Sequence, residues 1–472
     1  MPFARHPRPQ TLAALADLTH VPFWLDNPSR PDARAALVGP TDADLLVVGA
    51  GFTGLWTALL AKEADPGLDV VLVEGGRVAD GATGRNGGFV ASSLTHGFHN
   101  GVDRWPGDMR TLVAMGHANL DALEETVTRL GIDCDFRRSG EIDVATEPYQ
   151  VEHLRGVPDE AAPYGEKLEW LDRDQVRALV DSPTYLGAVY DREGVAMVDP
   201  ARLAWGLRDA CLALGVRLYE RTPVTGLSDE GAAVRATTPY GSVRAARVAL
   251  ATNAFPPLLR RLSHYVVPVW DYVLVTEPLT AEQRDSIGWS GRQGVGDSGN
   301  QFHYYRTTED GRILWGGYDA IYHWNNGFDP RMETDPESFG RLAEHFVETF
   351  PQLEGVRFTH GWGGAIDTCS RFSAFWGRAH RGKTAYVIGY TGLGVGASRF
   401  GAQVVLDLLA GRATQRTALE MVRDKPLPFP PEPVRSIGIG ITRRSLDKAD
   451  RREGHRDLWL RTLDRLGLGF DS

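Results

Sequence analysis

The sequence predicts an α/β fold, in which a discontinuous Rossmann-like nucleotide-binding domain carries an inserted, mostly antiparallel β-sheet domain. Apolar runs at 44–48 and 69–74 flank glycines and a helical stretch, which is the pattern of one βαβ unit of about thirty residues. Between 235 and 320 the pattern changes to β-rich alternation. A strand, glycines and a helix recur at 386–409, so we expect distant segments to build one domain.

Length, charge and cysteine usage limit the possible classes of protein. A chain of 472 residues is too long for one core, and a net charge of −10 argues against a nucleic-acid partner. Cys134, Cys211 and Cys369 lie far apart, so neither a disulfide framework nor a metal site is expected. The sequence lacks an apolar signal core and a run of roughly 20 apolar residues. These features predict a cytoplasmic protein without membrane attachment.

Four regions follow from these patterns. Helices are expected at 110–131, 201–214 and 335–349, and one charged helix at about 443–466. The expected regions are an N-terminal extension (1–43), a nucleotide-binding domain (44–100, 185–262 and 356–412), a substrate domain (101–184 and 263–355), and a C-terminal linker with a helical tail (413–472).

The first glycine loop predicts a dinucleotide site. Residues 49–54 read GAGFTG, which fits GxGxxG between a predicted strand and a predicted helix. The three glycines permit a tight turn, a close approach to a pyrophosphate, and packing of the helix on the strand. Glu74 ends the second strand, where an acidic side chain accepts hydrogen bonds from ribose hydroxyls. The predicted contacts of the loop itself are Gly49, Gly51, Phe52, Thr53 and Gly54.

A second glycine-rich segment, GATGRNGGF at 81–89, follows Glu74 closely and would let the backbone wrap a long ligand. Farther along the chain stand ATNA at 251–254 and GYTGLGVG at 389–396. In these motifs and their order the chain resembles the D-amino-acid oxidase-like superfamily of FAD enzymes. The segment at 81–89 is most similar to the γ-glutamylputrescine oxidase branch, beside the glycine and sarcosine oxidases.

The resemblance implies a GR2-type FAD-binding domain with the flavin ring against the inserted sheet. Sarcosine oxidases tether the flavin through a cysteine, but Cys369 lies several residues later than that position, which favours non-covalent FAD. The further cofactor contacts implied by the resemblance are Ala82, Thr83, Arg85, Asn86, Gly87, Gly88, Val224, Ala251, Thr252, Gly392, Leu393, Gly394, Val395 and Gly396.

The resemblance also implies oxidation of a small amine or amino acid, by hydride removal from a carbon that bears nitrogen. No essential acid–base pair is required, so His96 and Tyr305 are candidate catalytic residues rather than a predicted triad. Arg306 could hold a carboxylate or serve as a scaffold ion-pair partner, and His96 could accept a proton or be an ordinary loop histidine. The candidate substrate-binding residues are Tyr272, His303, Tyr305, Arg306 and Trp362.

Two questions about the reaction stay open at this level. The same superfamily includes enzymes of hydroxy acids, and an aminophosphonate is also compatible with the motifs. Sarcosine oxidases place a lysine beside the flavin to activate oxygen, whereas residues 266–350 contain no lysine. The electron acceptor is therefore expected to be O2 or another acceptor, such as a quinone or a carrier.

Overall fold

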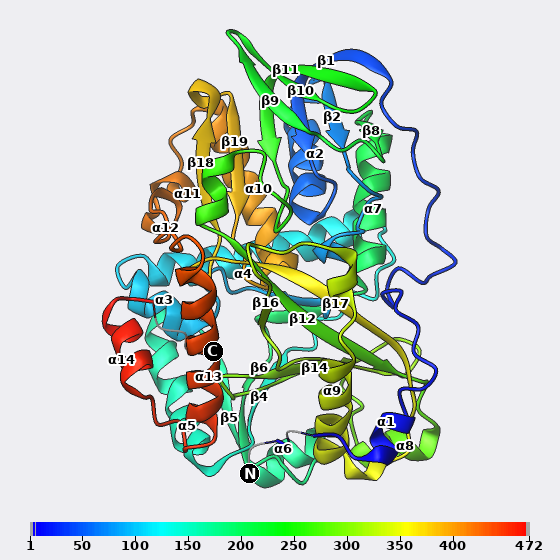
Figure 1. Cartoon of the computed structure of the whole chain (residues 1–472), viewed down its shortest axis with the longest axis vertical. Helices are drawn as coiled ribbons and strands as arrows, with labels where there is room; N and C mark the ends of the chain where they lie inside the picture. The colour runs from blue at the N-terminus through cyan, green and yellow to red at the C-terminus, as the bar shows by residue number, and fades with distance from the viewer. Residues whose placement is uncertain (1–2, 5, 469–472) are drawn as a thin grey trace.

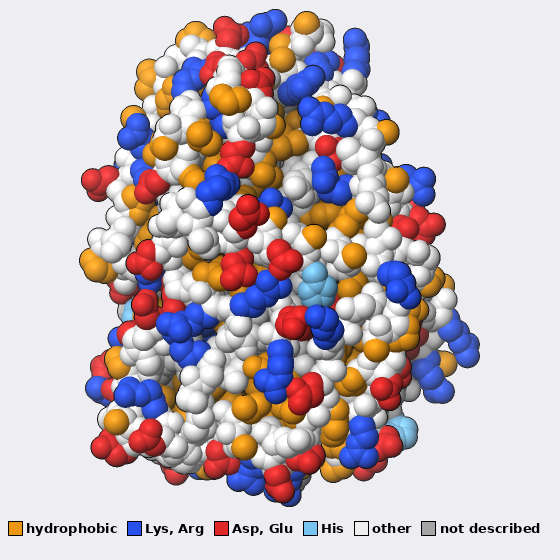
Figure 2. Space-filling view, turned by 180° about the vertical axis from the view of Figure 1, so that it is seen from behind, with side chains coloured by type: hydrophobic (Ala, Val, Ile, Leu, Met, Phe, Trp, Pro, Cys, Tyr) orange, Lys and Arg blue, Asp and Glu red, His pale blue; other side chains and the backbone are white. Residues whose placement is uncertain are grey.

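The computed structural model describes residues 3–4 and 6–468, and its two large sheets lie at opposite ends of the molecule (Figure 1). The outermost parts of the predicted N-terminal extension and C-terminal tail lie outside the described residues. Within the described part of the chain, every helix is too short or too polar to span a bilayer. On the face shown in Figure 2, acidic and basic side chains are interspersed.

The first sheet confirms that distant segments build one parallel core. Its main path runs β18-β19-β11-β1-β2-β8, and β1 pairs in parallel with both β11 and β2. The antiparallel β9–β10 hairpin is attached to β11. The strands are β1 (Gly39–Val48), β2 (Val70–Val73), β8 (Arg217–Tyr219), β9 (Gly226–Glu230), β10 (Ala233–Thr237), β11 (Gly241–Leu250), β18 (Phe375–Ala379) and β19 (Thr384–Ile388).

Both faces of this parallel sheet are covered, which explains why its strands read as continuous apolar runs. Val47 packs in the cluster that contains the covering helices. Leu46 and Val48 point to the opposite face and pack with residues of the β9–β10 hairpin. The covering helices are α2 (Phe52–Ala64), α7 (Pro200–Ala213) and α10 (Gly394–Ala410).

The second sheet is mostly antiparallel, as predicted, with one parallel pair between β13 and β4. Its path runs β16-β12-β15-β14-β13-β4-β6-β5, and β17 pairs with β12. Helix α9 (Pro336–Thr349) packs against β12 and β15. The strands are β4 (Glu141–Ala145), β5 (Leu168–Asp172), β6 (Gly187–Asp191), β12 (Val267–Thr276), β13 (Gly294–Asp297), β14 (His303–Thr307), β15 (Ile313–Gly317), β16 (Ile321–Tyr322) and β17 (Phe358–Thr368).

Several segments pair differently from the expected regions. Strands β6 and β17 lie in the second sheet, although 185–262 and 356–412 were expected in the nucleotide-binding domain. Helix α4 (Met109–Arg129) packs against α10, although 101–184 was expected in the substrate domain. Alternation and periodicity are local properties, whereas the partner of a strand or helix is chosen by tertiary packing.

The C-terminal tail forms two helices rather than the single helix expected at 443–466. They are α13 (Val434–Asp450) and α14 (Leu458–Arg465), and the chain turns between them at Glu453 and Gly454, which both have positive φ. The remaining α-helices and strands are α1 (Pro9–Ala13), β3 (Phe89–Ala91), α3 (Phe98–Arg104), α5 (Pro148–Ala161), α6 (Arg173–Leu179), β7 (Val195–Met197), α8 (Ala281–Ile287), α11 (Gln415–Ala418) and α12 (Glu420–Arg423).

Candidate active site

A cavity of about 1890 Å³ is lined by residues of both sheets. The first glycine loop, the 81–89 segment and the loop before α10 line it together with β12 and β14 of the second sheet. Small-molecule sites commonly measure roughly 300–1,000 Å³. This cavity therefore has room for a dinucleotide and a substrate together.

The glycine loop has the close contacts that a pyrophosphate site requires. A Cβ at Gly54 would lie 1.8 Å from the carbonyl oxygen of Gly49, so helix α2 packs on the loop only because residue 54 has no side chain. A Cβ at Gly51 would lie 2.9 Å from Oγ1 of Thr83. The N-cap residue Gly51 supplies no side-chain cap, and of the first N–H groups of α2 that of Phe52 donates to the hydroxyl of Thr83 at 3.0 Å. The backbone N–H groups at this end of α2 and its helix dipole are therefore suited to the phosphates of a dinucleotide.

Glu74 lies at the position expected for a ribose contact. Its carboxyl oxygens accept hydrogen bonds from the backbone N–H of Ala50 (2.7 Å) and of Gly76 (2.8 Å). Burial raises the pKa of Glu74 above its usual value. A carboxylate has about four lone-pair sites, so Glu74 retains capacity for ribose hydroxyls.

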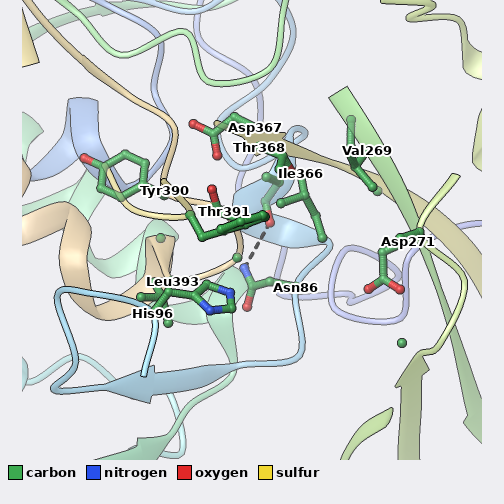
Figure 3. Close-up of a pocket in the computed structure, with 18 of the residues that line it drawn as sticks. Asn86, His96, Val269, Asp271, Ile366, Asp367, Thr368, Tyr390, Thr391 and Leu393 are labelled. Atoms are coloured by element: carbon green, nitrogen blue, oxygen red, sulfur yellow. Dashed lines mark hydrogen bonds between the residues drawn. The ribbon is translucent and has the colours of Figure 1, made fainter. Parts of the chain in front are cut away.

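Another part of the cavity wall is built by the loop that precedes α10 (Figure 3), and the hydroxyl of Tyr390 in this loop lies 2.9 Å from that of Thr53 in the first glycine loop. Asp367 accepts a 2.6 Å hydrogen bond from the backbone N–H of Gly389, and burial raises the pKa of Asp367 to about 6. Helix α10 begins without a side-chain cap. Its N-terminus thus offers N–H groups and positive dipole charge to the cavity, which suits the polar edge of a flavin.

Several non-glycine residues that line the cavity have left-handed backbone conformations, and three of them, His96, Asn253 and Thr391, belong to the glycine-rich loops or the segments beside them. The φ angles are 60° at His96, 46° at Asn253 and 51° at Thr391. Such conformations cost of order 1 kcal/mol and cluster at functional sites. Asn253 and Thr391 lie in motifs noted in the sequence but were not among the candidate contacts, because φ angles cannot be read from residue identity.

Asp271 of β12 points into the cavity and was missed by sequence reasoning (Figure 3). It accepts a 2.6 Å hydrogen bond from the hydroxyl of Tyr304 on β14. Burial raises the pKa of Asp271 to about 7, although the hydrogen bond from Tyr304 acts in the opposite direction. One sequence signal was present: Asp271 is the single charged residue in the otherwise apolar strand Val267–Thr276.

Most of the candidate cofactor residues line the cavity. Gly54, Gly88 and Gly396 do not; they are close-packing positions, since a Cβ at Gly88 would lie 2.3 Å from the Val198 carbonyl oxygen and one at Gly396 would lie 2.2 Å from that of Ala91. The candidates that line the cavity are Gly49, Gly51, Phe52, Thr53, Glu74, Ala82, Thr83, Arg85, Asn86, Gly87, Val224, Ala251, Thr252, Gly392, Leu393, Gly394 and Val395.

Three of the candidate substrate residues face away from the cavity. Tyr272, His303 and Tyr305 are buried in or beside the apolar cluster between the second sheet and α9. The hydroxyl groups of Tyr305 and Tyr185 share a 2.7 Å hydrogen bond, which excludes Tyr305 from contact with a substrate. Side chains alternate between the faces of a strand, so the neighbours Asp271 and Tyr304 face the cavity instead.

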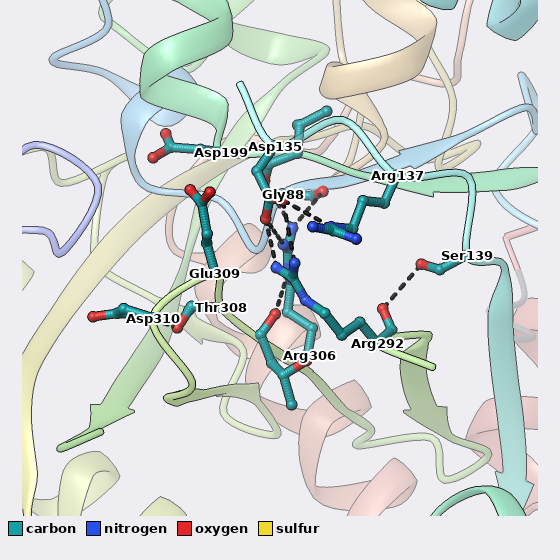
Figure 4. Close-up of polar contacts among 12 residues, drawn as sticks. Gly88, Asp135, Arg137, Ser139, Asp199, Arg292, Arg306, Thr308, Glu309 and Asp310 are labelled. Carbon is teal, nitrogen blue, oxygen red and sulfur yellow. Dashed lines mark hydrogen bonds and ion pairs between the residues drawn. The ribbon is translucent and has the colours of Figure 1, made fainter. Parts of the chain in front are cut away.

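Arg306 and Trp362 lie on the cavity side of the sheet but are covered by backbone. The guanidinium of Arg306 donates to the carbonyl oxygens of Gly88 (3.2 Å) and Val198 (2.7 Å), so Arg306 is a scaffold residue (Figure 4). The indole N–H of Trp362 donates to the Arg85 carbonyl oxygen at 2.9 Å. Neither side chain is available to a ligand in this structure.

The remaining candidates are His96 and Cys369. His96 lines the cavity, and burial lowers its pKa, so the neutral imidazole is favoured near pH 7. The thiol of Cys369 is fully buried and donates to the carbonyl oxygens of Ser373 and Gly389. Among the described residues, no group of three or more His, Cys, Asp or Glu side chains could hold a metal ion.

Known proteins that are similar to this chain in sequence or in fold include oxidoreductases and an oxidase. The chain is 33% identical over 395 residues to gamma-glutamylputrescine oxidoreductase of Escherichia coli (strain K12), which covers 82% of this chain and 88% of that protein. It is 29% identical over 401 residues to the probable oxidoreductase OrdL of Haemophilus influenzae, with the same coverage. Glycine oxidase from Geobacillus kaustophilus superposes with a TM-score of 0.66 at 21% identity, over 81% of this chain and 99% of that one, which shows a shared fold.

The family model for FAD dependent oxidoreductases matches residues 44–408. This range contains the glycine loop, the 81–89 segment and the loop before α10, which line the cavity together. The chain therefore belongs to the FAD dependent oxidoreductase (DAO) family.

Proposed function

We propose that this enzyme oxidises a C–N bond of an amine to an imine. The observation that carries the proposal is the carboxyl of Asp271, which faces the cavity with a pKa raised to about 7. A cationic ammonium group is the natural partner of a carboxylate in such a site. The similarity to a gamma-glutamylputrescine oxidoreductase supports an amine as the substrate.

The residues around the cavity bind FAD and prepare the substrate. FAD, when bound, supplies a two-electron acceptor that takes a hydride from the carbon bearing the nitrogen. Gly49, Gly51 and Glu74 hold the ADP half, and the loop before α10 holds the flavin end. The buried Cys369 thiol lies outside the cavity lining, which supports non-covalent FAD.

Asp271 acts on the substrate before oxidation. An ammonium group has no lone pair to assist loss of hydride from the neighbouring carbon, so it must first lose a proton. We assign that proton to the carboxylate of Asp271, whose raised pKa matches operation near neutral pH. The neutral imidazole of His96 is the second cavity group able to accept a proton. Hydrolysis of the imine then gives a carbonyl product and ammonia.

The same carboxylate disfavours the alternative substrates. A hydroxy acid, an aminophosphonate or an amino acid brings its own negative charge, which Asp271 would repel at the reacting end. Asp271 therefore favours an amine without a neighbouring acid group over all three. Among the described residues that line the cavity there is no lysine, and the rate of reoxidation in air distinguishes O2 from a carrier as the electron acceptor.

Anaerobic mixing tests this proposal. Purified protein that contains FAD is mixed with amines, amino acids, aminophosphonates and hydroxy acids, and the visible flavin absorbance is followed. We expect amines to bleach it, and bleaching by hydroxy acids alone would overturn the proposal. Admitting air afterwards separates an oxidase, which recovers its colour at once, from a dehydrogenase that needs another acceptor.

A further inference from the structure

The cavity extends beyond the flavin end to two carboxyl groups that the proposed amine oxidation does not use. Glu141 and Asp143 stand two residues apart on β4, so they share a face of the strand, and both line the cavity. The side chain of Asp143 is accessible from the cavity, and the protein around the cavity partly shields its carboxyl from bulk water. Among residues 3–4 and 6–468, no side chain or backbone group forms a hydrogen bond or an ion pair with either carboxyl.

One face of the second sheet forms the floor of the cavity between Asp271 on β12 and the two carboxyl groups on β4. Cross-strand pairing places Gly316, Tyr304, Gly296 and Asp143 in one row that runs from β15 to β4. A Cβ at Gly296 would lie 3.1 Å from Oδ1 of Asp143, so the glycine keeps the floor open in front of this carboxyl. A ligand that starts at Asp271 can therefore continue along the sheet toward β4.

The electrostatic neighbours of the two carboxyl groups are acidic. Asp143 and Asp191 raise the pKa of Glu141, while Asp191 and Asp297 raise that of Asp143, in each case after the larger effect of burial. No arginine or lysine contributes to either group. Carboxyl groups surrounded by protein are normally paired, and a cationic ligand would supply the partner that these two lack.

The walls of this part of the cavity are largely apolar. Leu154 and Val157 of α5 and Trp459 and Leu460 of α14 are among the residues that line the cavity, together with His153 and Arg456. Asp450 at the end of α13 fixes the α13–α14 hairpin to the β13–β14 loop, because its carboxyl accepts hydrogen bonds from the backbone N–H groups of residues 300 and 301. The compartment thus combines walls suited to methylene groups with an acidic floor.

We propose that Glu141 and Asp143 bind the second cationic group of a long diamine or polyamine, whose first amine is oxidised beside Asp271. This inference rests on the amine chemistry proposed above and narrows its substrate class. Four strand spacings separate β12 from β4, which is roughly 19 Å along the sheet. A hydrogen bond of about 3 Å joins each terminal nitrogen to its carboxyl group. An extended chain of about ten bonds spans the remaining distance between the two nitrogens.

The compartment disfavours other occupants. A substrate with a distal carboxylate would meet like charge, because every charged neighbour of Glu141 and Asp143 is acidic. A metal ion is also disfavoured, since these side chains do not form a group of three ligands within the described chain. The chemistry that fits both walls and floor is an alkyl chain that ends in an ammonium group.

The test compares diamines with monoamines of the same length. Steady-state kcat/KM is measured for α,ω-diaminoalkanes and n-alkylamines of four to twelve carbons, on the FAD-loaded full-length enzyme. Because a charge-assisted hydrogen bond contributes about 1.5–3 kcal/mol, the diamine should exceed its matched monoamine about tenfold or more at the favoured length. The advantage should be greatest for chains of about ten bonds and small for four carbons.

Variants then assign the preference to the two carboxyl groups. Asp143→Asn and Glu141→Gln, which keep shape and remove charge, should reduce the diamine-to-monoamine ratio about tenfold. Asp159→Asn on the exposed side of α5 makes the same charge change outside the cavity lining and should leave the ratio unaltered.

The outcomes separate this inference from the proposed function. If amines bleach the flavin but the wild-type enzyme treats long diamines and monoamines alike, the distal cation site is overturned and amine oxidation stands. A diamine preference that survives Asp143→Asn and Glu141→Gln also overturns the site. If no amine bleaches the flavin, the proposed function itself fails.

Discussion

The hydroxyl of Tyr304 donates a 2.6 Å hydrogen bond to the carboxyl of Asp271 across the intervening strand β15. The bond passes over Gly316, where a Cβ would lie 2.7 Å from the tyrosine ring. The pair therefore depends on a glycine in the strand between its members. It places a hydrogen-bonded carboxyl on the cavity floor, where the proposed reaction needs a proton acceptor.

Asp271→Asn should remove the proton acceptor while it preserves shape. We expect kcat/KM for a reactive amine to fall about 10²- to 10⁴-fold, the usual contribution of general base catalysis. FAD content should stay close to that of the wild type, since Asp271 is not among the proposed cofactor contacts. Steady-state kinetics and the flavin-to-protein absorbance ratio check both expectations. An unchanged kcat/KM would contradict the assignment of Asp271.

The pH profile should report the carboxyl of Asp271. A general base accepts a proton only when it is ionised. The value of kcat/KM should therefore be low at acid pH and rise with pH through an apparent pKa near 7. The hydrogen bond from Tyr304 lowers the pKa of Asp271, so Tyr304→Phe should move this rising limb to higher pH. Profiles of kcat/KM from pH 5 to 10 provide the measurement. A limb that moves to lower pH, or does not move, would argue against the pair.

Gly54→Ala should disrupt the nucleotide site. The added methyl group would lie 1.8 Å from the Gly49 carbonyl oxygen, so the loop and α2 must separate. We expect loss of FAD on gel filtration together with a lower Tm. Gly226→Ala is the matched control, because no atom lies within 4 Å of the Cβ position at Gly226. Retention of FAD by Gly54→Ala at wild-type levels would refute the packing role.

Arg306→Met should affect stability rather than substrate recognition. The substitution removes the guanidinium donor of the buried Val198 carbonyl oxygen and leaves that of Gly88 with only the backbone N–H of Val198, which should cost about 2–4 kcal/mol of unfolding free energy. KM for the amine should change little, since Arg306 does not line the cavity. Denaturant unfolding and steady-state kinetics on the same preparation distinguish the two roles. A large rise in KM without loss of stability would contradict the structural role and indicate that Arg306 binds the substrate.

The nucleotide-binding half of the molecule could be predicted from the sequence because its determinants are local. GAGFTG at 49–54 requires glycine for reasons of backbone geometry within one βαβ unit, and Glu74 follows at the end of the second strand. Apolar runs buried on both faces identified the parallel strands, since such runs reflect the coverage of each strand. The order of the later motifs then identified the family.

Only the tertiary structure decided which side chains reach the substrate. The sequence placed Tyr272 and Tyr305 on the correct strands, but a strand exposes alternate residues to opposite faces, and the side on which α9 packs is not encoded locally. That packing turned Tyr272 and Tyr305 into the core and left Asp271 and Tyr304 in the cavity. Likewise, Glu141 and Asp143 became neighbours of the active site only when β4 paired with β13, because strand pairing joins residues that are distant along the chain.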